Sequence, residues 1–154
     1  MTTLKNEVKL SGQGIHSGMP VNIIIKPSDK KGIFFRRVDV PGADLIAARF
    51  DNVGDTKMRN TTIGNPCGAH VQTVEHLMAA FFIAGIDSAI VEIDGCETPI
   101  LDGSASIFYE KLSAAADTRT PMRRIIVRRE VSVSARDVMR TLPVGLRIKI
   151  WFMN

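Results

Sequence analysis

The 154-residue sequence is poor in the residue types that mark several classes of protein. It contains only two cysteines, Cys67 and Cys96, far apart in the chain, so we predict reduced thiols and no disulfide framework. The longest strongly apolar stretch, Leu77 to Ile86, is far shorter than the roughly 20 residues that cross a bilayer, which predicts no transmembrane segment. The first ten residues carry scattered charges and lack the apolar core of a secretory signal. We therefore predict a cytoplasmic protein.

Aromatic residues are also scarce, at 6% of the chain, and this scarcity bears on nucleic-acid binding. Basic residues crowd one segment: Arg119, Arg123, Arg124, Arg128 and Arg129. No aromatic residues are interleaved with these arginines, and alternating apolar residues from Ile125 to Val133 indicate paired strands with a charged outer face. We predict no nucleic-acid partner. The formal net charge of +4 fits either an anionic partner such as a nucleotide diphosphate or an ordinary basic surface.

What is present is typical of a globular domain, because hydrophobic residues make up 45% of the chain and charged residues 23%. Strand-like segments Glu7 to Leu10 and Val21 to Lys26 flank the glycine-rich GQGIHSG, which predicts a hairpin. Further strands are predicted from Gly32 to Val38 and from Ala89 to Ile93. The turn signal Asp94-Gly95 then predicts a second hairpin.

Two helices are predicted among these strands. The first runs from Thr73 to about Ala84, because its apolar residues recur at helical spacing. We predict that the Thr73 hydroxyl caps this helix and that Gly85 ends it in a left-handed conformation. The second helix ends near Ala116, with Ser104 or Asp102 as its predicted cap. Strands and helices together indicate an α+β fold.

The polar segment DTRTP, residues 117–121, separates this α+β part from new strands, and we predict a linker there. Residues 1–116 would form one complete domain. Residues 122–154 are too few for a domain and would be the truncated start of a second one. Their apolar strand edge, uncovered by any predicted helix, would favour self-association or a complementing chain.

Glu75 and His76 are the strongest candidates for chemistry, because both fall in the first turn of the first predicted helix. A neutral imidazole nitrogen can bind zinc, and a nearby carboxylate can take a proton from metal-bound water. A simpler explanation is an exposed glutamate at the positive end of the helix and a histidine hydrogen-bonded nearby. Spacing alone leaves both interpretations open.

A complete zinc site is harder to find, since a catalytic zinc normally takes three protein ligands and a water. The chain has three histidines, His16, His70 and His76, and no HExxH pair. Cys67 and His70 form only a weak Cys-x-x-His pair. His16 lies in the GQGIHSG loop, whose glycines permit close approach to a ligand, although no GK[ST] follows as in a P-loop. Asp102, in LDGSAS, could orient a catalytic group or cap a helix.

Several segments resemble, in order and approximate spacing, the lipid A deacetylase family LpxC: GQGIHSG, FFRR, NTTIG, TVEHLMAA, AGIDSAIVEI and ETPILDGSAS. The resemblance covers about Leu4 to Leu112, and TVEHLMAA followed by PILDGSA is a specific combination. It implies two similar α+β domains, each a sheet with two helices packed on one face, with zinc and substrate between them. This chain would hold the whole first domain and the start of the second.

The resemblance also implies a reaction, zinc-dependent hydrolysis of the acetamide of UDP-3-O-acyl-N-acetylglucosamine in lipid A biosynthesis. It makes Glu75 the general base for zinc-bound water and His76 a zinc ligand. Other residues are implied to lie near the substrate without binding zinc: His16, Met58, Thr61 and Asp102.

The family's remaining zinc ligands and its general-acid histidine belong to the second domain and have no counterpart in this sequence. We therefore expect the isolated chain to bind zinc poorly and to deacetylate little or nothing. A noncatalytic remnant, an interaction module and one half of a split enzyme are the alternative functions.

Overall fold

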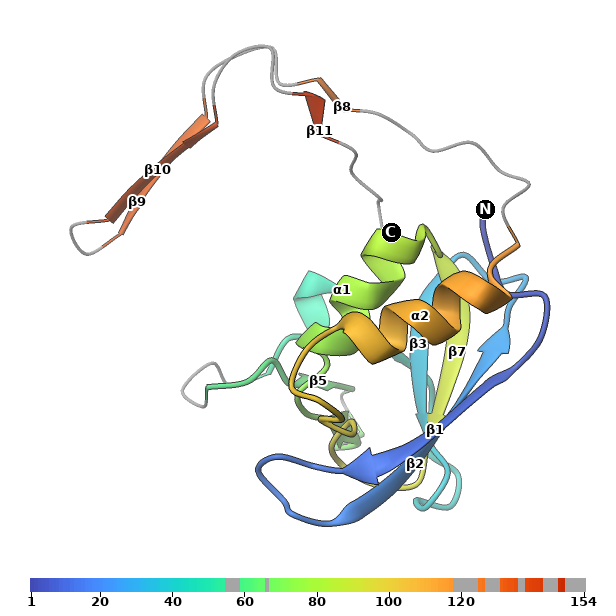
Figure 1. The fold of residues 1–154 in the computed structure, drawn as a ribbon. Coiled ribbons are helices and arrows are strands. Elements are labelled where there is room, and N and C mark those ends of the chain that lie inside the picture. The colour runs from blue at the N-terminus through green and yellow to red at the C-terminus, as the bar shows by residue number, and fades with distance from the viewer. Residues whose placement is uncertain are drawn as a thin grey trace. The chain divides into compact units, whose positions relative to one another are not determined.

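The computed structural model of this protein describes residues 1–54, 59–65 and 67–117 in full, and the backbone of four short strands beyond residue 124 (Figure 1). The chain divides into two units, the second formed by Pro121–Phe152. In the second unit, β8 (Ile125–Ile126) pairs with β11 (Arg147–Ile148), and β9 (Val131–Ala135) pairs with β10 (Val138–Leu142). The division into domain, linker and truncated second domain stays a prediction.

The first unit is built on a five-stranded mixed sheet with strand order β1-β2-β7-β3-β4. Its strands are β1 (Val8–Gln13), β2 (Pro20–Pro27), β3 (Gly32–Arg37), β4 (Ile46–Ala47) and β7 (Ser88–Ile93). All neighbouring pairs are antiparallel except β3 and β7, which are parallel. A parallel pair needs a long crossover, and the chain between these two strands contains the first helix.

The predicted β1–β2 hairpin is confirmed, with Val8 opposite Ile25 at one end and Gln13 opposite Pro20 at the other. The second predicted hairpin is wrong, because the residues that follow Ile93 form no strand paired with β7. Both hydrogen-bonding edges of β7 are already occupied by β2 and β3, so a following strand has no edge to join.

Two helices, α1 (Glu75–Ala84) and α2 (Ser106–Ala115), lie over one face of the sheet (Figure 1). Their buried side chains pack with alternate strand residues into one core: Leu77, Phe81, Phe108 and Leu112 from the helices, and Ile25, Phe35, Val91 and Ile93 from the strands. The α+β fold with two helices on one face of a sheet is therefore confirmed. No helix of the described residues is both long and apolar enough to span a membrane.

The opposite face of the sheet carries charged side chains. Lys26 Nζ lies 2.6 Å from Glu92 Oε2, and Arg36 Nη1 lies 3.5 Å from Glu92 Oε1. Ion pairs on a partly exposed face contribute little to stability, so the apolar face beneath the helices holds this unit together.

The start of α1 differs from the sequence-based prediction. Val74, rather than Thr73, is the N-cap, and no side chain caps the helix. Thr73 instead has a left-handed backbone, with φ of 57°, and its hydroxyl donates to Oε1 of Glu97. The predicted end is confirmed, because Gly85 is left-handed with φ of 75° and its N–H donates to the carbonyls of Phe81 and Phe82.

The predicted cap of α2 is also wrong. Ala105 is the N-cap, and neither Asp102 nor Ser104 caps the helix from that position. The side chain of Asp102 accepts hydrogen bonds from the N–H and hydroxyl of Ser104, and the Ser104 hydroxyl accepts from the N–H of Ser106. The polar residues thus stabilise the turn before the helix instead of its first residue.

Smaller elements lie between β4 and α1. Phe50–Asn52 form the 3₁₀ helix η1, and β5 (Ile63–Gly64) pairs with β6 (His70–Val71). The strand β6 was not predicted from the sequence, because two residues give no detectable alternation. This hairpin brings the chain back to the start of α1.

Candidate functional site

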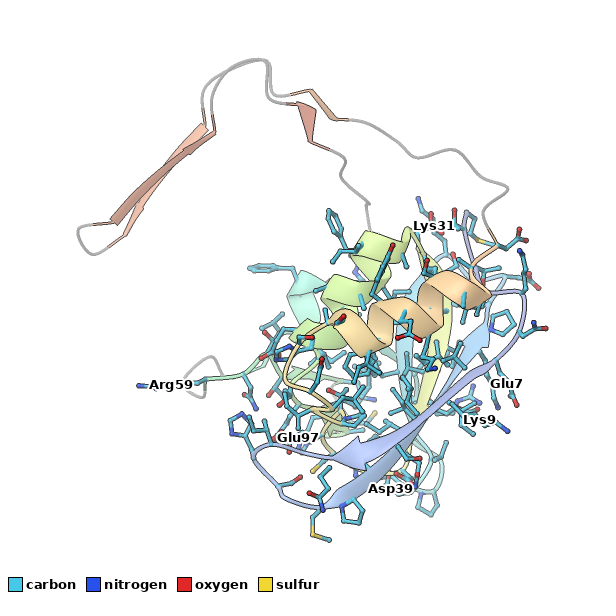
Figure 2. The ribbon with its side chains drawn as sticks, in the orientation of Figure 1. Glu7, Lys9, Lys31, Asp39, Arg59 and Glu97 are labelled. Carbon is cyan, nitrogen blue, oxygen red and sulfur yellow. The ribbon has the colours of Figure 1, made fainter. Side chains whose placement is uncertain are left out.

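Segments from three distant parts of the chain meet where the chain enters α1. They are the loop between β1 and β2, residues 60–62, and residues 97–102 after β7. Figure 2 labels Glu97 among these loops, close to the β1–β2 hairpin. The hydrogen bonds between these segments involve three of the sequence-predicted site residues: His16, Thr61 and Glu75.

Glu75 is the first residue of α1, and its side chain is tied to the loop before the helix. The backbone N–H of Thr61 donates to Glu75 Oε2 over 3.0 Å, and the N–H of Val74 donates to the Thr61 carbonyl over 3.3 Å. Two predicted site residues, Glu75 and Thr61, are therefore in direct contact. An ionised carboxylate at a helix N-terminus interacts favourably with the helix dipole. In that form it has further lone pairs to accept a proton from water.

His76 follows Glu75 in the first turn of α1 and is half-buried. Its imidazole forms no hydrogen bond within the described part of the chain, so a ring nitrogen is available to a ligand. A complete zinc site is not formed by the described residues, since they contain no group of three or more His, Cys, Asp or Glu side chains able to hold a metal. Glu75 and His76 thus fit part of a zinc centre at most.

Glu97 links these segments, and it is not among the site residues predicted from the sequence. Its side chain is buried, with only 2% of the residue exposed. Oε1 accepts from the N–H of His16 over 3.0 Å and from the Thr73 hydroxyl over 2.9 Å, while Oε2 accepts from the N–H of Ser17 over 2.8 Å. The only signal for this role in the sequence is an acidic residue in the otherwise uncharged CETPIL. That signal does not say which donors the carboxylate meets.

Two opposing effects act on the pKa of Glu97. Burial raises the pKa, while hydrogen bonds from the backbone N–H groups of His16 and Ser17, and from the hydroxyls of Ser17 and Thr73, lower it. The hydrogen bonds outweigh burial, so the pKa of this carboxyl lies below its ordinary value of 4.5. Glu97 is therefore an anion at neutral pH.

The glycine at position 14 allows the loop to approach this carboxylate. A Cβ atom added to Gly14 would overlap both the Glu97 carboxylate and the Ser17 hydroxyl. His16 itself projects an exposed side chain from the loop, and only its backbone is bound by Glu97. The GQGIHSG loop is thus held through its backbone by Glu97, and the side chain of His16 remains exposed on it.

Thr73 is held from the same side by the residue after Glu97. The Thr98 hydroxyl donates to the Thr73 carbonyl over 2.6 Å, and the Thr98 N–H donates to the Gln72 carbonyl over 3.1 Å. A left-handed backbone is unfavourable for a β-branched residue and persists where the surroundings enforce it. The segment 97–98 therefore fixes the turn from which Glu75 and His76 follow.

Asp102 lies at the other end of this segment, on the surface. The preceding Leu101 is left-handed, with φ of 53°, and the Ile100 N–H donates to the carbonyl of Gln13 over 2.9 Å. These contacts run residues 97–102 alongside the end of β1. Met58, the remaining predicted site residue, lies outside the described residues.

The Cys67–His70 pair belongs to a different part of the surface. Both residues line an open hollow of about 480 Å³ together with Arg37 and Asp44. Cys67 Sγ lies 3.8 Å from Asp44 Oδ2, and Arg37 donates to the His70 carbonyl. The pair shares no hydrogen bond with Glu75 or His76 in the described structure. The described residues around this pair form no group of three side chains able to hold a metal.

Comparison with known proteins identifies the source of these motifs. Residues 1–153 match the family described as UDP-3-O-acyl N-acetylglycosamine deacetylase, LpxC. A UDP-3-O-acyl-N-acetylglucosamine deacetylase of Geotalea uraniireducens is 44% identical over 138 residues, which are 88% of this chain and 44% of that protein. A deacetylase of the same description from Teredinibacter turnerae is 41% identical, over 85% of this chain and 44% of that protein. Another, from Geobacter sp. M21, is 39% identical, over 97% of this chain and 50% of that protein. The chain thus spans about half the length of the curated relatives it matches.

Proposed function

The chain belongs to the LpxC family of UDP-3-O-acyl N-acetylglycosamine deacetylases, and we propose that it supplies one half of the active site of such an enzyme. The proposed reaction is removal of the acetyl group from UDP-3-O-acyl-N-acetylglucosamine, a hydrolytic step of lipid A biosynthesis. The observation that carries this proposal is the start of α1, where the N–H of Thr61 fixes the Glu75 carboxylate and the next residue is His76, whose imidazole has no hydrogen-bond partner among the described residues.

Glu75 is proposed as the general base. Water attacks the acetamide carbonyl carbon, and the carboxylate oxygen that is not bound by Thr61 accepts the proton of that water. The carbon–nitrogen bond then breaks, acetate leaves, and the sugar nitrogen takes up a proton to become an amine. A positioned base of this kind contributes about 10²–10⁴-fold to a rate. The hydrogen bond from Thr61 supports this role because it fixes the orientation of the carboxylate.

His76 is proposed as one zinc ligand, through the ring nitrogen that has no partner among the described residues. Zinc would polarise the carbonyl and acidify its bound water. Because the described residues do not form a complete zinc site, we assign no step of the reaction to the metal. The other ligands would come from the portion of the relatives that this chain does not match.

Residues around this pair are proposed to bind the substrate. The His16 imidazole is exposed on a loop that Glu97 holds, Thr61 contacts the base, and Asp102 lies on the surface at the end of the same segment as Glu97. The proposal extends to Met58, on the strength of the resemblance alone. Their ligand would be the acylated UDP-sugar.

A partial set of zinc donors favours a second proposal, that the chain by itself is nearly inactive. One half of a split enzyme and a noncatalytic remnant share this property. They differ in whether a second polypeptide that carries the missing ligands restores turnover.

Acetate release from UDP-3-O-acyl-N-acetylglucosamine tests both proposals. One sample is the 154-residue chain, and the other is a chimera in which its residues 1–120 replace the matching part of the Geotalea uraniireducens relative. We expect turnover by the chimera and little or none by the chain. Zinc-dependent turnover by the chain alone would contradict the second proposal, and a folded but inactive chimera would contradict the first.

A further inference from the structure

Glu97 is a buried anion that no cation in the described part of the chain neutralises. It forms none of the ion pairs of that part, and its oxygens accept only from neutral donors, which are the backbone N–H groups of His16 and Ser17 and the hydroxyls of Ser17 and Thr73. Removing a carboxylate from water is unfavourable, and a well-packed apolar residue often stabilises a core at least as well. The hydrogen bonds outweigh this cost, and they tie the carboxylate to the segments that carry the donors.

The donors come from two segments that lie far apart in the sequence. His16 and Ser17 precede Glu97 by 81 and 80 residues, and Thr73 precedes it by 24. One side chain therefore joins the loop that presents His16 to the turn that precedes Glu75. Donors from both segments thus fix the position of the carboxylate.

The Thr73 turn is under strain, and Glu97 helps to hold it. A positive φ at a β-branched residue is an outlier, and the hydroxyl bond to Glu97 is one of the contacts that keep Thr73 in this conformation. The two residues after Thr73 are the N-cap and the first residue of α1, so a change of its φ and ψ would redirect the carboxylate of Glu75. The Thr61 N–H, bound to that carboxylate, reports such a change.

We infer that Glu97 is a positioning residue, which acts through Thr73 and the loop backbone to hold Glu75, His76 and His16 in one arrangement. The inference rests on the proposed function, because it concerns the geometry of that site. Glu97 itself is buried beneath the loop and is not assigned a contact with substrate.

The test measures amide hydrogen exchange in the full chain by NMR, expressed as protection factors at His16, Ser17 and Thr61. Glu97→Gln keeps the shape of the side chain but turns one acceptor oxygen into an NH₂ donor that faces other donors. We expect protection to fall at least about tenfold at all three amides, which corresponds to about 1.4 kcal/mol. The matched control Glu92→Gln, on the opposite face of the sheet, should leave all three unchanged.

Two further measurements separate positioning from simple loss of structure. Core amides of α1 and β7, such as those of Phe81 and Val91, should keep their protection in Glu97→Gln. In the unmodified chain, protection at Thr61 should fall together with that at His16 as the pH drops through the pKa of Glu97, whereas the Gln variant should lack this step. Glu97→Asp, which keeps the charge on a shorter side chain, should give intermediate protection.

Unchanged protection at Thr61 in Glu97→Gln would overturn the inference even if His16 and Ser17 lose protection, because Glu97 would then hold the loop alone. If Glu97→Gln does not fold, the pH titration of the unmodified chain decides by the same criterion. Neither readout depends on turnover. A failed acetate-release assay therefore counts against the proposed function, and an unresponsive Thr61 amide counts against this inference.

Discussion

The backbone N–H of Thr61 donates a hydrogen bond of 3.0 Å to the side chain of Glu75. This contact joins a residue in an irregular loop to the first residue of α1, and it orients one carboxylate oxygen without using the other. Among the described residues it is the most direct contact between two members of the proposed site.

The core beneath α1 should depend on the buried Phe81 and not on the exposed Phe50. Phe81 is fully buried, whereas Phe50 is 94% exposed. Replacement of a buried phenylalanine by alanine leaves a cavity, so we expect Phe81→Ala to lower the free energy of unfolding by about 3–5 kcal/mol. Phe50→Ala should change it by no more than about 0.5 kcal/mol. Urea titrations of the two variants and the unmodified chain measure the difference, and equal effects would contradict the assigned core.

Gly14 should resist replacement for a steric reason. A methyl group there would overlap the Glu97 carboxylate and the Ser17 hydroxyl, so Gly14→Ala should lower the free energy of unfolding by about 1–3 kcal/mol. Gly54→Ala is the matched control, because its Cβ would meet Thr62 only at ordinary contact distances of 3.7 Å and more. Thermal unfolding of both variants tests this expectation. A Gly14→Ala protein as stable as the Gly54→Ala protein would show that the loop does not lie against Glu97.

Stability should fall in acid partly because of Glu97. Its pKa is lower in the folded chain than in the unfolded chain, so between the two values the unfolded state binds more protons. The contribution is fully present above about pH 4.5, the ordinary value, and is lost as the pH falls through the folded pKa. We therefore expect the free energy of unfolding to decline less between pH 5 and pH 2 in Glu97→Gln than in the unmodified chain. Parallel declines would contradict the depressed pKa.

A second carboxyl should contribute to the same acid sensitivity independently. Arg37 donates to both oxygens of Asp39, over 2.8 and 2.6 Å, and these hydrogen bonds lower the pKa of Asp39. The pKa of Asp39 is shifted in the same direction as that of Glu97, so the stabilisation from ionised Asp39 is also lost as the pH falls. Because Asp39 is partly exposed, its effect should be the smaller of the two. Asp39→Asn measured over the same pH range gives the comparison, and a larger effect than that of Glu97→Gln would contradict this ranking.

Zinc should bind weakly to the 154-residue chain. With one imidazole and a nearby carboxylate, we expect a binding free energy well short of the about 10–16 kcal/mol of complete structural zinc sites. A chelator should therefore leave the urea unfolding midpoint unchanged, and titration calorimetry should show no tight stoichiometric binding. A midpoint that falls when metal is removed would mean that the chain holds a complete site.

The sequence predicts the elements whose signals are local. The alternation in β2, the glycine-flanked turn after β1 and the left-handed Gly85 each depend on residues close together in the chain, and each is confirmed. The α+β class followed from these elements. The placement of Glu75 and His76 in the first turn of α1 was also predictable, because apolar spacing locates the helix start to within two residues.

The errors share a physical cause, which is competition from partners distant in sequence. Asp94-Gly95 is a good hairpin signal, but β2 and β3 already flank the strand before it. Thr73 is a good cap residue, but its hydroxyl donates a hydrogen bond to the carboxylate of Glu97 instead of capping the helix. Glu97 itself escaped notice because three of its donors become neighbours only when the loop, the turn and the segment after β7 meet. Secondary-structure propensity and residue spacing contain no information about contacts between segments that are distant in the sequence.

The most direct test of the central claim is acetate release by the chimera with Glu75→Gln, compared with Glu110→Gln. Both changes remove one carboxylate, but Glu110 lies exposed on α2, away from the Thr61 contact. We predict that Glu75→Gln lowers kcat by about 10²–10⁴-fold and that Glu110→Gln leaves it unchanged. A Glu75→Gln chimera as active as the Glu110→Gln chimera would show that this chain does not supply the general base.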